Sequence, residues 1–445
     1  MADLPRKSVT RTAKLAALPL GYAGRTALGL GKRLGGASAE MVLTDIQQRT
    51  AEQLFRTLGE LKGGAMKVGQ AMSVFEAALP DDLVAPYREQ LTRLQDSAPP
   101  MPTITVREIL AEQFGTDWQQ SLVEFDAEPA AAASIGQVHR GRWVDGREVA
   151  IKVQYPGADK ALYSDLKQIS RLASSMAPIL PGIDVNALMK ELRERAVEEL
   201  DYALEAEAQQ RFADEYAGDP DIVVPNVVTA GPKVIVSEWL ESTGSLLQVI
   251  NEGTQAERDH YGQELVKFMF GSPSRTGMLH ADPHPGNFRL LPGQDGRPGK
   301  LGVLDYGAVA RLPEGNLPRT LGELIRIAAM DDYEEVIIAL RKGGFIKDKV
   351  RIDPERLQAY LGPFVEPTRV EEFHFTRSWM RGQFNRINDP KGDAFSVMTK
   401  LNMPAEYLLI HRTWTGGVGI LSQLEARVSF RKLMTEHLPG FAEES

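Results

Sequence analysis

The stretch PAAAASIGQVHRGRWVDGREVAIKV, from Pro129 to Val153, decides how this chain folds. Apolar residues alternate with polar ones along it, and Val and Ile are frequent, so it predicts short strands joined by tight turns. Gly136 and Val138 hold the last two places of a G-x-G-x-x-G-x-V pattern, whose backbone lies over phosphate groups. The stretch ends on Val-Ala-Ile-Lys, which places Lys152 to contact phosphate oxygens. Alanines fill the first two glycine places, Ala131 and Ala133.

A second motif, HADPHPGNF from His280 to Phe288, offers a carboxylate and an amide. Asp282 and Asn287 stand in a D-x-x-x-x-N arrangement on a loop stiffened by two prolines and a glycine. Phosphoryl transfer needs a carboxylate to orient or deprotonate the attacking hydroxyl, and an amide oxygen to hold magnesium. We therefore predict Asp282 as the catalytic carboxylate and Asn287 as a metal ligand. Taken alone, the same string also fits an Asp/Pro turn followed by a capping asparagine.

The third motif is VLDYGAVA, an apolar strand that ends in Asp305-Tyr306-Gly307. It has the place and shape of the D-F-G of protein kinases, whose aspartate holds magnesium against the β- and γ-phosphates. The order of the three motifs and their spacing make chance a poor explanation. We therefore predict an α+β fold of the two-lobed protein-kinase type, a small β-rich lobe before a helical lobe, with Asp305 as a metal ligand.

A phosphate-binding lysine needs a helix-borne carboxylate to fix its position. The acidic segment AVEELDYALEAEAQQRF offers five candidates, of which we favour Glu205 as the partner of Lys152: Glu198, Glu199, Asp201, Glu205 and Glu207. The apolar strand in VIVSEWLES fits either the hinge that receives adenine through backbone groups or a plain buried strand end. As a hinge it presents Glu238, Trp239 and Leu240 to the nucleotide.

The alanine-rich loop should hold a triphosphate differently from a glycine-rich one. Glycine lets the backbone approach phosphates closely, whereas alanine gives up part of that freedom and favours a helical turn. We expect a stiffer loop that slows or redirects transfer to an outside acceptor. The residues predicted to contact the nucleotide are Ala131, Ala132, Ala133, Ser134, Gly136 and Val138.

These motifs together resemble the UbiB/AarF family of atypical kinases, over about residues 40 to 310. The alanine-rich loop is one family mark, and two others are a K-x-G-Q motif at Lys67, Gly69 and Gln70 and an E-x-D pair at Glu199 and Asp201. The resemblance implies that the K-x-G-Q helix folds over the nucleotide site, adding Lys67 and Gln70 to the catalytic residues, and that the E-x-D helix holds it there. It also implies binding of ATP or ADP with Mg²⁺, and ATP hydrolysis rather than efficient phosphorylation of proteins.

The resemblance further implies a role in isoprenoid-quinone or related lipid metabolism at a membrane surface. The partners it suggests are anionic lipid or a prenyl-lipid precursor, and biosynthetic partner proteins. We divide the chain into a basic leader at 1–38, a helical K-x-G-Q extension at 39–120, a kinase-like small lobe with inserted helices at 121–240, and a helical lobe at 241–445. In the last, HRTWTGGVGILSQL predicts a helix whose glycines serve core packing or form a groove against a neighbour.

Composition narrows the function classes. The 445 residues are 43% hydrophobic and 25% charged, which is ordinary for a globular protein. A net charge of −9 argues against nucleic-acid binding, and the absence of cysteine excludes disulfides and thiolate catalysis and fits a cytoplasmic protein. No uninterrupted apolar run reaches about 18 residues, so we predict no transmembrane helix. The basic N-terminal segment RTAKLAALPLGYAGRTALGLGKRL fits either a solvated leader packed on the rest or a peripheral contact with the inner face of a membrane.

Two other functions stay open from the sequence. A small-molecule phosphotransferase of the aminoglycoside or choline kinase type has a similar catalytic loop, but does not combine it with the alanine-rich loop and the K-x-G-Q extension. A nucleotide-sensing scaffold would bind without turnover, although every group needed for chemistry is present. The oligomeric state and the phosphoryl acceptor are open.

Overall fold

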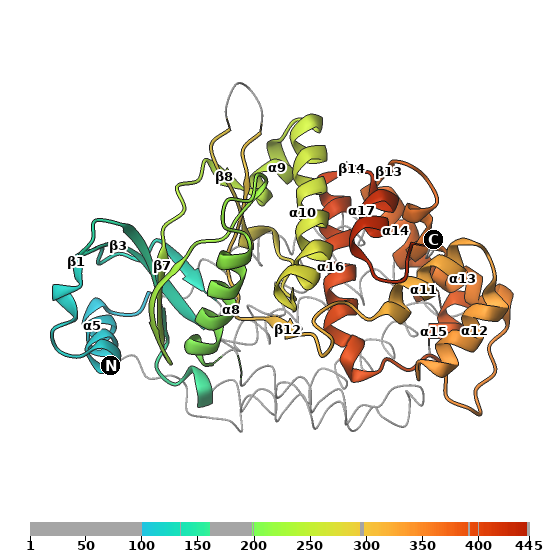
Figure 1. Cartoon of the computed structure of the whole chain (residues 1–445), viewed down its shortest axis with the longest axis horizontal. Helices are drawn as coiled ribbons and strands as arrows, with labels where there is room; N and C mark the ends of the chain where they lie inside the picture. Colours follow the sequence, from blue (N-terminus) through green and yellow to red (C-terminus); the bar gives the residue numbers. More distant parts are fainter. Residues whose placement is uncertain are drawn as a thin grey trace, which may run out of the picture.

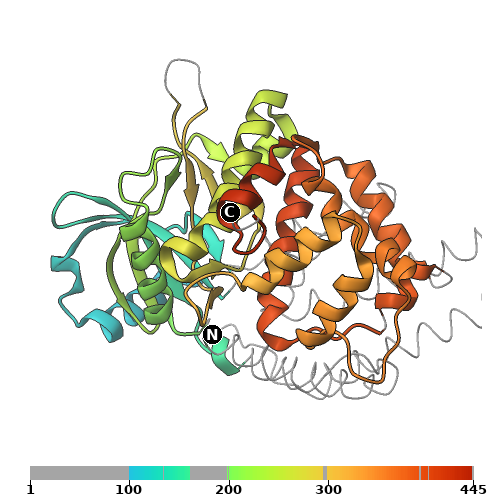
Figure 2. The same cartoon turned by 45° about the vertical axis from the view of Figure 1, so that its right-hand side comes forward.

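The computed structural model describes residues 100–133, 135–160, 198, 200–293, 298–389, 392–398 and 400–442. Within them the chain forms a β-rich lobe and a larger helical lobe, the α+β protein-kinase-like architecture that the motif order predicts (Figure 1). Figure 2 shows the sheet and the bulk of the helices on opposite sides of the molecule. The expected leader at 1–38 and most of the expected extension at 39–120 lie outside the described residues, as do Lys67, Gly69, Gln70, Ser134 and Glu199.

The β-rich lobe is an antiparallel sheet in the order β1-β3-β4-β7-β6, with β2 added on β3. Its strands are β1 (Leu122–Phe125), β2 (Ala131–Ala133), β3 (Gly136–Trp143), β4 (Glu148–Gln154), β6 (Val227–Gly231) and β7 (Val234–Glu238). One helix packs on each face, α5 (Thr103–Phe114) and α8 (Tyr202–Glu215). The short 3-10 turn η2 (Trp118–Gln120) joins α5 to β1.

The alternation of side chains along β4 explains why both faces of the sheet are covered by helices. Val149, Ile151 and Val153 are fully buried and pack in one cluster with Ile109 and Leu110 of α5. Side chains alternate across a strand, so Lys152 points to the opposite face, toward α8. Helix α5, which lies within the range expected for the extension, thus forms the core of the β-rich lobe together with the sheet.

The alanine-rich loop is extended, which corrects the expectation of a helical turn. Ala131, Ala132 and Ala133 form β2 and pair in register with Val138, Gln137 and Gly136 of β3. The amide of Ala130 also donates to the carbonyl of Val138 at 2.8 Å. Hydrogen bonds from an existing strand outweigh the weak helical preference of alanine, because propensity is a small term that tertiary context overrides.

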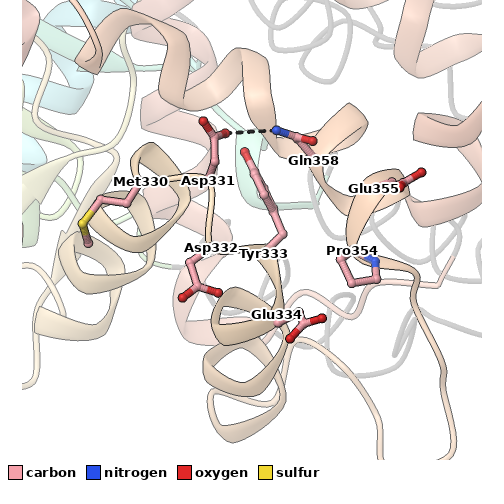
Figure 3. Close-up of a pocket in the computed structure, with 8 residues that line it drawn as sticks. All are labelled: Met330, Asp331, Asp332, Tyr333, Glu334, Pro354, Glu355 and Gln358. Carbon is pink, nitrogen blue, oxygen red and sulfur yellow. Dashed lines mark hydrogen bonds between the residues drawn. The ribbon is translucent and has the colours of Figure 1, made fainter.

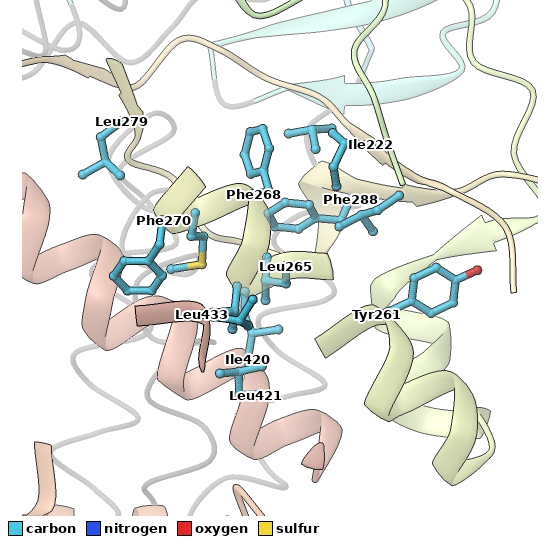
Figure 4. Packing of buried hydrophobic residues seen from close by; sticks show 14 of the residues in the cluster. Ile222, Tyr261, Leu265, Phe268, Phe270, Leu279, Phe288, Ile420, Leu421 and Leu433 are labelled. Carbon is cyan, nitrogen blue, oxygen red and sulfur yellow. The ribbon is translucent and has the colours of Figure 1, made fainter. Parts of the chain in front are cut away.

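The larger lobe is built around α10, a helix of 22 residues. Its apolar side chains, among them Leu265 and Phe268, pack against strands on one side and the C-terminal helices on the other (Figure 4). The helices of this lobe are α9 (Leu246–Glu252), α10 (Gln255–Thr276), α11 (Arg319–Ala329), α12 (Tyr333–Lys342), α13 (Pro354–Val365), α14 (Arg377–Asn388), α15 (Asp393–Met398), α16 (Leu408–Leu424) and α17 (Phe430–His437), with 3-10 turns η4 (Pro285–Asn287), η5 (Glu366–Thr368) and η6 (Ala405–Tyr407). None of the helices in the described ranges has the length and apolar character needed to cross a membrane.

Short strands in the described residues form three further sheets outside the β-rich lobe. A four-stranded sheet has the order β5-β11-β10-β8, and two separate ribbons pair β9 with β12 and β13 with β14. Their bounds are β5 (Ile222–Val223), β8 (Gly244–Ser245), β9 (Met278–His280), β10 (Phe288–Leu290), β11 (Leu301–Val303), β12 (Val309–Arg311), β13 (Phe373–His374) and β14 (Arg427–Val428). Helix α8 packs on β6 and β7 and also contacts α10, so it connects the two lobes.

Candidate active site

Two strand pairs bring the HADPHPGNF and DYG segments together. The first segment runs from β9 into β10, the second runs from β11 to β12, and β9 pairs with β12 while β10 pairs with β11. Backbone bonds between the loops complete the arrangement: Leu304 donates to the carbonyl of Asn287 at 2.8 Å, and Ala281 donates to that of Ala308 at 2.9 Å. Two motifs that are separate in the sequence therefore form one surface.

The loop that carries Asp282 begins where α10 ends. Gly277 caps α10 with φ 73°, in the left-handed region that glycine adopts readily, and turns the chain into β9. Within the loop, the amide nitrogen of Asn287 donates to the Asp282 carbonyl at 3.0 Å and to its carboxylate Oδ2 at 3.1 Å. The two residues predicted to act together are thus in direct contact, and the Asn287 nitrogen faces Asp282, which leaves its oxygen for a metal.

Two histidines stiffen this loop as neutral groups. The Nε2 of His280 donates to the carbonyl of Asp305 at 2.9 Å, linking the two motifs. The Nδ1 of His284 accepts from the amide of Gly286 at 3.1 Å. Burial lowers the pKa of both imidazoles, although the nearby carboxylates of Asp282 and Asp305 oppose this. Each ring therefore acts through fixed hydrogen bonds and not as a charge.

Lys152 lies at the centre of an ion-pair cluster between the lobes. Its ammonium donates to both carboxylate oxygens of Glu205 on α8, at 2.7 and 3.0 Å, and to Oδ1 of Asp305 at 3.2 Å. Burial by itself would lower the pKa of Lys152, but the carboxylates of Asp305 and Glu205 outweigh it and raise that pKa well above its usual value. Lys152 is therefore a fixed cation that reaches carboxylates from both lobes.

The register of the sheet places the loop residues around this lysine. Val138 lies directly opposite Lys152, and Ala131 lies opposite Val138, so these three side chains share one face. The ring of Tyr202 lies under the lysine, with the ammonium 5.1 Å from the ring centroid. The Tyr202 hydroxyl is buried and has no hydrogen-bond partner among the described residues, which is an unusual state for a buried polar group.

Gly136 keeps its glycine for a packing reason. A Cβ at this position would overlap the carbonyl oxygen of Val153 and come within 2.8 Å of the Tyr202 hydroxyl. By contrast, Ala131 and Ala132 are exposed on β2. The loop therefore keeps a glycine where the sheet and α8 crowd the backbone, and carries alanine where side chains have room.

Asp305 has the backbone strain expected of a functional turn. Its φ is 61°, in the left-handed region that few residues other than glycine adopt. Its Oδ1 accepts from Lys152 and from the amide of Gly307 at 3.3 Å. Asp305 and Asn287 offer the oxygen ligands that Mg²⁺ prefers, and a magnesium site needs few protein ligands because phosphate and water supply the others. The donor set fits this ion, although the described residues include no cluster of three or more His, Asp or Glu placed to bind a metal by themselves.

The predicted hinge follows β7 directly. The amide of Glu238 donates to the carbonyl of Asn226 and that of Trp239 donates to the carbonyl of Glu148, both at 2.9 Å. Bonds from Asn226 and Arg147 engage the Glu238 carboxylate. Both backbone amides are thus bonded within the sheet and do not offer a free donor to an adenine base.

Asp201 caps α8 in the described structure. Its Oδ1 accepts from the amide of Ala203 at 3.0 Å, which satisfies one of the free amides at the helix start. The other half of the E-x-D pair, Glu199, and the K-x-G-Q residues Lys67 and Gln70 lie outside the described residues. Contact between these motifs stays a prediction.

The sequence reasoning missed one residue that touches Asp282. The Nη2 of Arg412, on α16, donates to Oδ1 of Asp282 at 2.6 Å. The glycines noted in the same segment explain the approach, because a Cβ at Gly416 would lie 2.5 Å from Cγ of Pro283 and one at Gly417 would overlap Met269. A glycine pair one turn after an arginine was the available signal, and of its two interpretations the structure shows core packing.

An open pocket of about 490 Å³ lies elsewhere in the helical lobe, between the start of α12 and α13 (Figure 3). Its lining includes Asp331, Asp332, Glu334 and Glu355. None of the residues predicted from the sequence lines it. We therefore place the candidate active site at the Lys152 and Asp282 clusters.

Comparison with known proteins shows which family the chain resembles. The sequence model of the ABC1 atypical kinase-like domain matches residues 93–339. Atypical kinase COQ8, mitochondrial, of Schizosaccharomyces pombe is 32% identical over 419 residues, 93% of this chain and 66% of that protein. Protein ACTIVITY OF BC1 COMPLEX KINASE 1, chloroplastic, of Arabidopsis thaliana is 32% identical over 357 residues, 76% of this chain and 49% of that protein. This chain thus matches less than the full length of both relatives.

A solved structure is similar over nearly the whole chain. The Rv3197–erythromycin complex from Mycobacterium tuberculosis is 42% identical in sequence and aligns with a TM-score of 0.68. The match covers 92% of this chain and 100% of that chain.

Proposed function

Because this chain belongs to the UbiB/AarF family of atypical kinases, whose ABC1 kinase-like domain it carries, we propose that it binds Mg-ATP and hydrolyses it. One observation carries the proposal. Lys152 from the sheet, Glu205 from α8 and Asp305 from the DYG turn meet within hydrogen-bond distance. The Asp282–Asn287 contact lies beside them, joined through His280 and the backbone of Leu304.

Each group has a role in phosphoryl transfer. Lys152, fixed by Glu205, contacts the α- and β-phosphates, and Asp282 orients the attacking water or hydroxyl. Asn287 and Asp305 hold Mg²⁺, which neutralises phosphate charge when it is bound. In this arrangement Lys152 exchanges its contact with Asp305 for phosphate oxygens, while the buried Glu205 keeps its position.

The nucleotide lies against the sheet face that carries Lys152. The residues proposed to contact it are Ala131, Ala132, Ala133, Ser134, Gly136, Val138, Glu238, Trp239 and Leu240. Because β2 is a paired strand, its amides are not all free to turn toward phosphate as those of a glycine-rich loop are. This supports hydrolysis, or transfer to a small acceptor, over efficient phosphorylation of proteins.

The biological setting follows from the family. We propose support of isoprenoid-quinone or related lipid metabolism at a membrane surface, with Lys67 and Gln70 acting over the nucleotide site and Glu199 and Asp201 holding their helix. Anionic lipid or a prenyl-lipid precursor is the partner that this setting implies.

The test is phosphate release from Mg-ATP by the purified chain, with and without vesicles containing anionic lipid. We expect release that requires Mg²⁺, rises with the vesicles and falls by about 100-fold or more in Asp282→Asn, the scale of losing a general base. Glu207→Gln is the matched control, because Glu207 is an exposed carboxylate of α8 that contacts Arg311 and not Lys152. Nucleotide binding with no release that depends on Asp282 would favour the scaffold over the ATPase.

A second candidate function is macrolide binding, because the Mycobacterium tuberculosis relative was solved as a complex with erythromycin. Calorimetric titration of this chain with erythromycin, in the presence and absence of Mg-ADP, tests it. Saturable one-to-one binding supports this candidate, and no heat of binding up to the solubility of the drug rejects it.

A further inference from the structure

The ion pair between Arg412 and Asp282 joins a C-terminal helix to the catalytic loop. Nη2 of Arg412 donates to Oδ1 of Asp282 at 2.6 Å, while Oδ2 of the same carboxylate accepts from Asn287 at 3.1 Å. Both oxygens of Asp282 are thus engaged. A substrate group that needs this carboxylate has to share it with a partner or displace one.

Helix α16 is shaped to deliver this arginine. Gly416 lies one turn after Arg412 and therefore on the same helix face. It is buried against Pro283, the residue that follows Asp282, and Gly417 is buried against Met269 of α10. Larger side chains at either glycine would push the helix away, and Arg412 would no longer reach Asp282.

The arginine can change partners because nearly half of its side chain is exposed. The Arg412 side chain is 45% exposed, whereas that of Asp282 is 14% exposed. Water can hydrate the exposed guanidinium when it leaves Asp282, and Asn287 remains bonded to Oδ2 of that carboxylate. A guanidinium also binds phosphate oxygens as well as it binds a carboxylate, through the same planar set of donors.

The catalytic loop itself places no lysine or arginine next to Asp282. The residue directly before Asp282 is Ala281, which is fully buried and carries no charge. The catalytic loop from residue 281 to 287 reads ADPHPGN and holds no lysine or arginine. The cation seen in contact with Asp282 comes instead from α16, as Arg412.

We propose that Arg412 pairs with Asp282 in the absence of nucleotide and moves to the γ-phosphate when Mg-ATP binds, which leaves Asp282 to orient the attacking oxygen. This inference rests on the proposed function, because it takes Asp282 as the residue that faces the acceptor. An arginine placed at the transferring phosphoryl group stabilises the charge that develops there. Helix α16 then supplies such an arginine within the same chain.

The test compares two nucleotides that differ in the γ-phosphate. Calorimetry measures the affinity of Mg-ADP and of Mg-AMPPNP, a non-hydrolysable ATP analogue, for the wild type, Arg412→Ala, Arg412→Lys and the control Arg431→Ala. Arg431 is an exposed arginine of α17. We expect Arg412→Ala to weaken AMPPNP binding by about tenfold, the scale of one charge-assisted hydrogen bond. ADP binding should change by less than about twofold, with Arg412→Lys between wild type and alanine.

A double variant distinguishes a direct contact between Arg412 and the γ-phosphate from repulsion of that phosphate by Asp282. Removing Arg412 also leaves Asp282 without its cation, and the bare carboxylate would repel a γ-phosphate. In Arg412→Ala/Asp282→Asn that repulsion is gone, so a direct contact predicts that AMPPNP binding stays weak. Full recovery in the double variant would overturn the proposal.

The remaining outcomes are decisive as well. Equal weakening of ADP and AMPPNP in both Arg412 variants would assign Arg412 a merely structural role and overturn the inference alone. Failure of the wild type to bind either nucleotide would overturn the proposed function, and this inference with it. Thermal unfolding of each variant without nucleotide identifies any loss that comes from misfolding, and Arg412→Lys keeps the test valid if the alanine variant is unstable.

Discussion

Two ion pairs of the site, Lys152–Glu205 in the β-rich lobe and Arg412–Asp282 in the helical lobe, differ in burial. The Lys152 and Glu205 side chains are 14% and 5% exposed, whereas those of Arg412 and Asp282 are 45% and 14% exposed. Breaking the Lys152–Glu205 pair leaves both charges away from water, which is costly, whereas the guanidinium of Arg412 can be hydrated when it leaves Asp282. The Lys152 pair therefore fixes the geometry of the site, and the Arg412 pair is available for exchange with a ligand.

The largest effect on stability is expected from removal of the Glu205 carboxylate. Glu205→Ala leaves the Lys152 ammonium buried beside Asp305 alone, and we expect the free energy of unfolding to fall by about 3–5 kcal/mol. Arg412→Ala should lower it by no more than about 1 kcal/mol. Urea denaturation without nucleotide measures both, with the exposed Glu207→Ala as the control. Similar losses in Glu205→Ala and Glu207→Ala would show that the buried pair is not special.

The second prediction concerns the crowded glycine beside the lysine. In Gly136→Ala the new methyl group meets the Val153 carbonyl and the Tyr202 hydroxyl, so we expect a loss of about 1–3 kcal/mol from overpacking. Ala132→Ser, at an exposed place on the adjoining strand, should change the unfolding free energy by less than about 0.5 kcal/mol. Thermal unfolding of both variants checks this. An unchanged midpoint in Gly136→Ala would mean that the sheet and α8 do not constrain this position.

A third prediction concerns protonation of the buried histidines His280 and His284 at low pH. Their pKa values are lowered by burial, so the unfolded chain binds more protons than the folded protein in mild acid. Stability is then full above the unfolded pKa of about 6.5 and falls as the pH drops below it, by about 1.4 kcal/mol for each unit by which a pKa is lowered. Urea midpoints at pH 8 and pH 5.5 measure the drop. His280→Gln should show a smaller drop than wild type, and an equal one would exclude His280 as its source.

The smallest effect is expected at the start of α8, the helix that carries Glu205. Asp201→Ala removes the helix cap and should cost about 1 kcal/mol, whereas Asp201→Asn keeps a capping oxygen and should cost little. Thermal unfolding gives the ranking. If both variants lose the same stability, the charge of Asp201 matters beyond the cap, as its place in the E-x-D pair would suggest.

The fold was predictable because the V-A-I-K, D-x-x-x-x-N and D-Y-G motifs follow one another in the order and at the spacing of protein kinases. Each motif is local, and pairing of the flanking strands brings Asp282, Asn287 and Asp305 together without further information. Among the acidic residues of α8, Glu205 is the one that meets Lys152, because it is buried on the face toward the sheet, whereas Glu207 is exposed.

Two features could not be predicted for physical reasons. Arg412 lies 130 positions after Asp282, and its helix approaches the carboxylate by packing one glycine on the catalytic loop and another on α10. The alanines of β2 have a local preference for helix, but β3 offers them strand partners. Contacts between distant segments place Arg412, and pairing with an adjacent strand sets the conformation of the alanines. In both cases these contacts outweigh the preference of the local sequence.

A crystal structure with AMPPNP and Mn²⁺ in place of Mg²⁺ would show whether the Lys152 and Asp282 clusters form one Mg-ATP site. Anomalous scattering locates the manganese without reference to the protein density. Our account predicts a peak bound by Asp305 and Asn287, with Lys152 on phosphate oxygens and Glu205 still paired to it. Nucleotide or manganese bound elsewhere, with Lys152 still on Asp305, would contradict it.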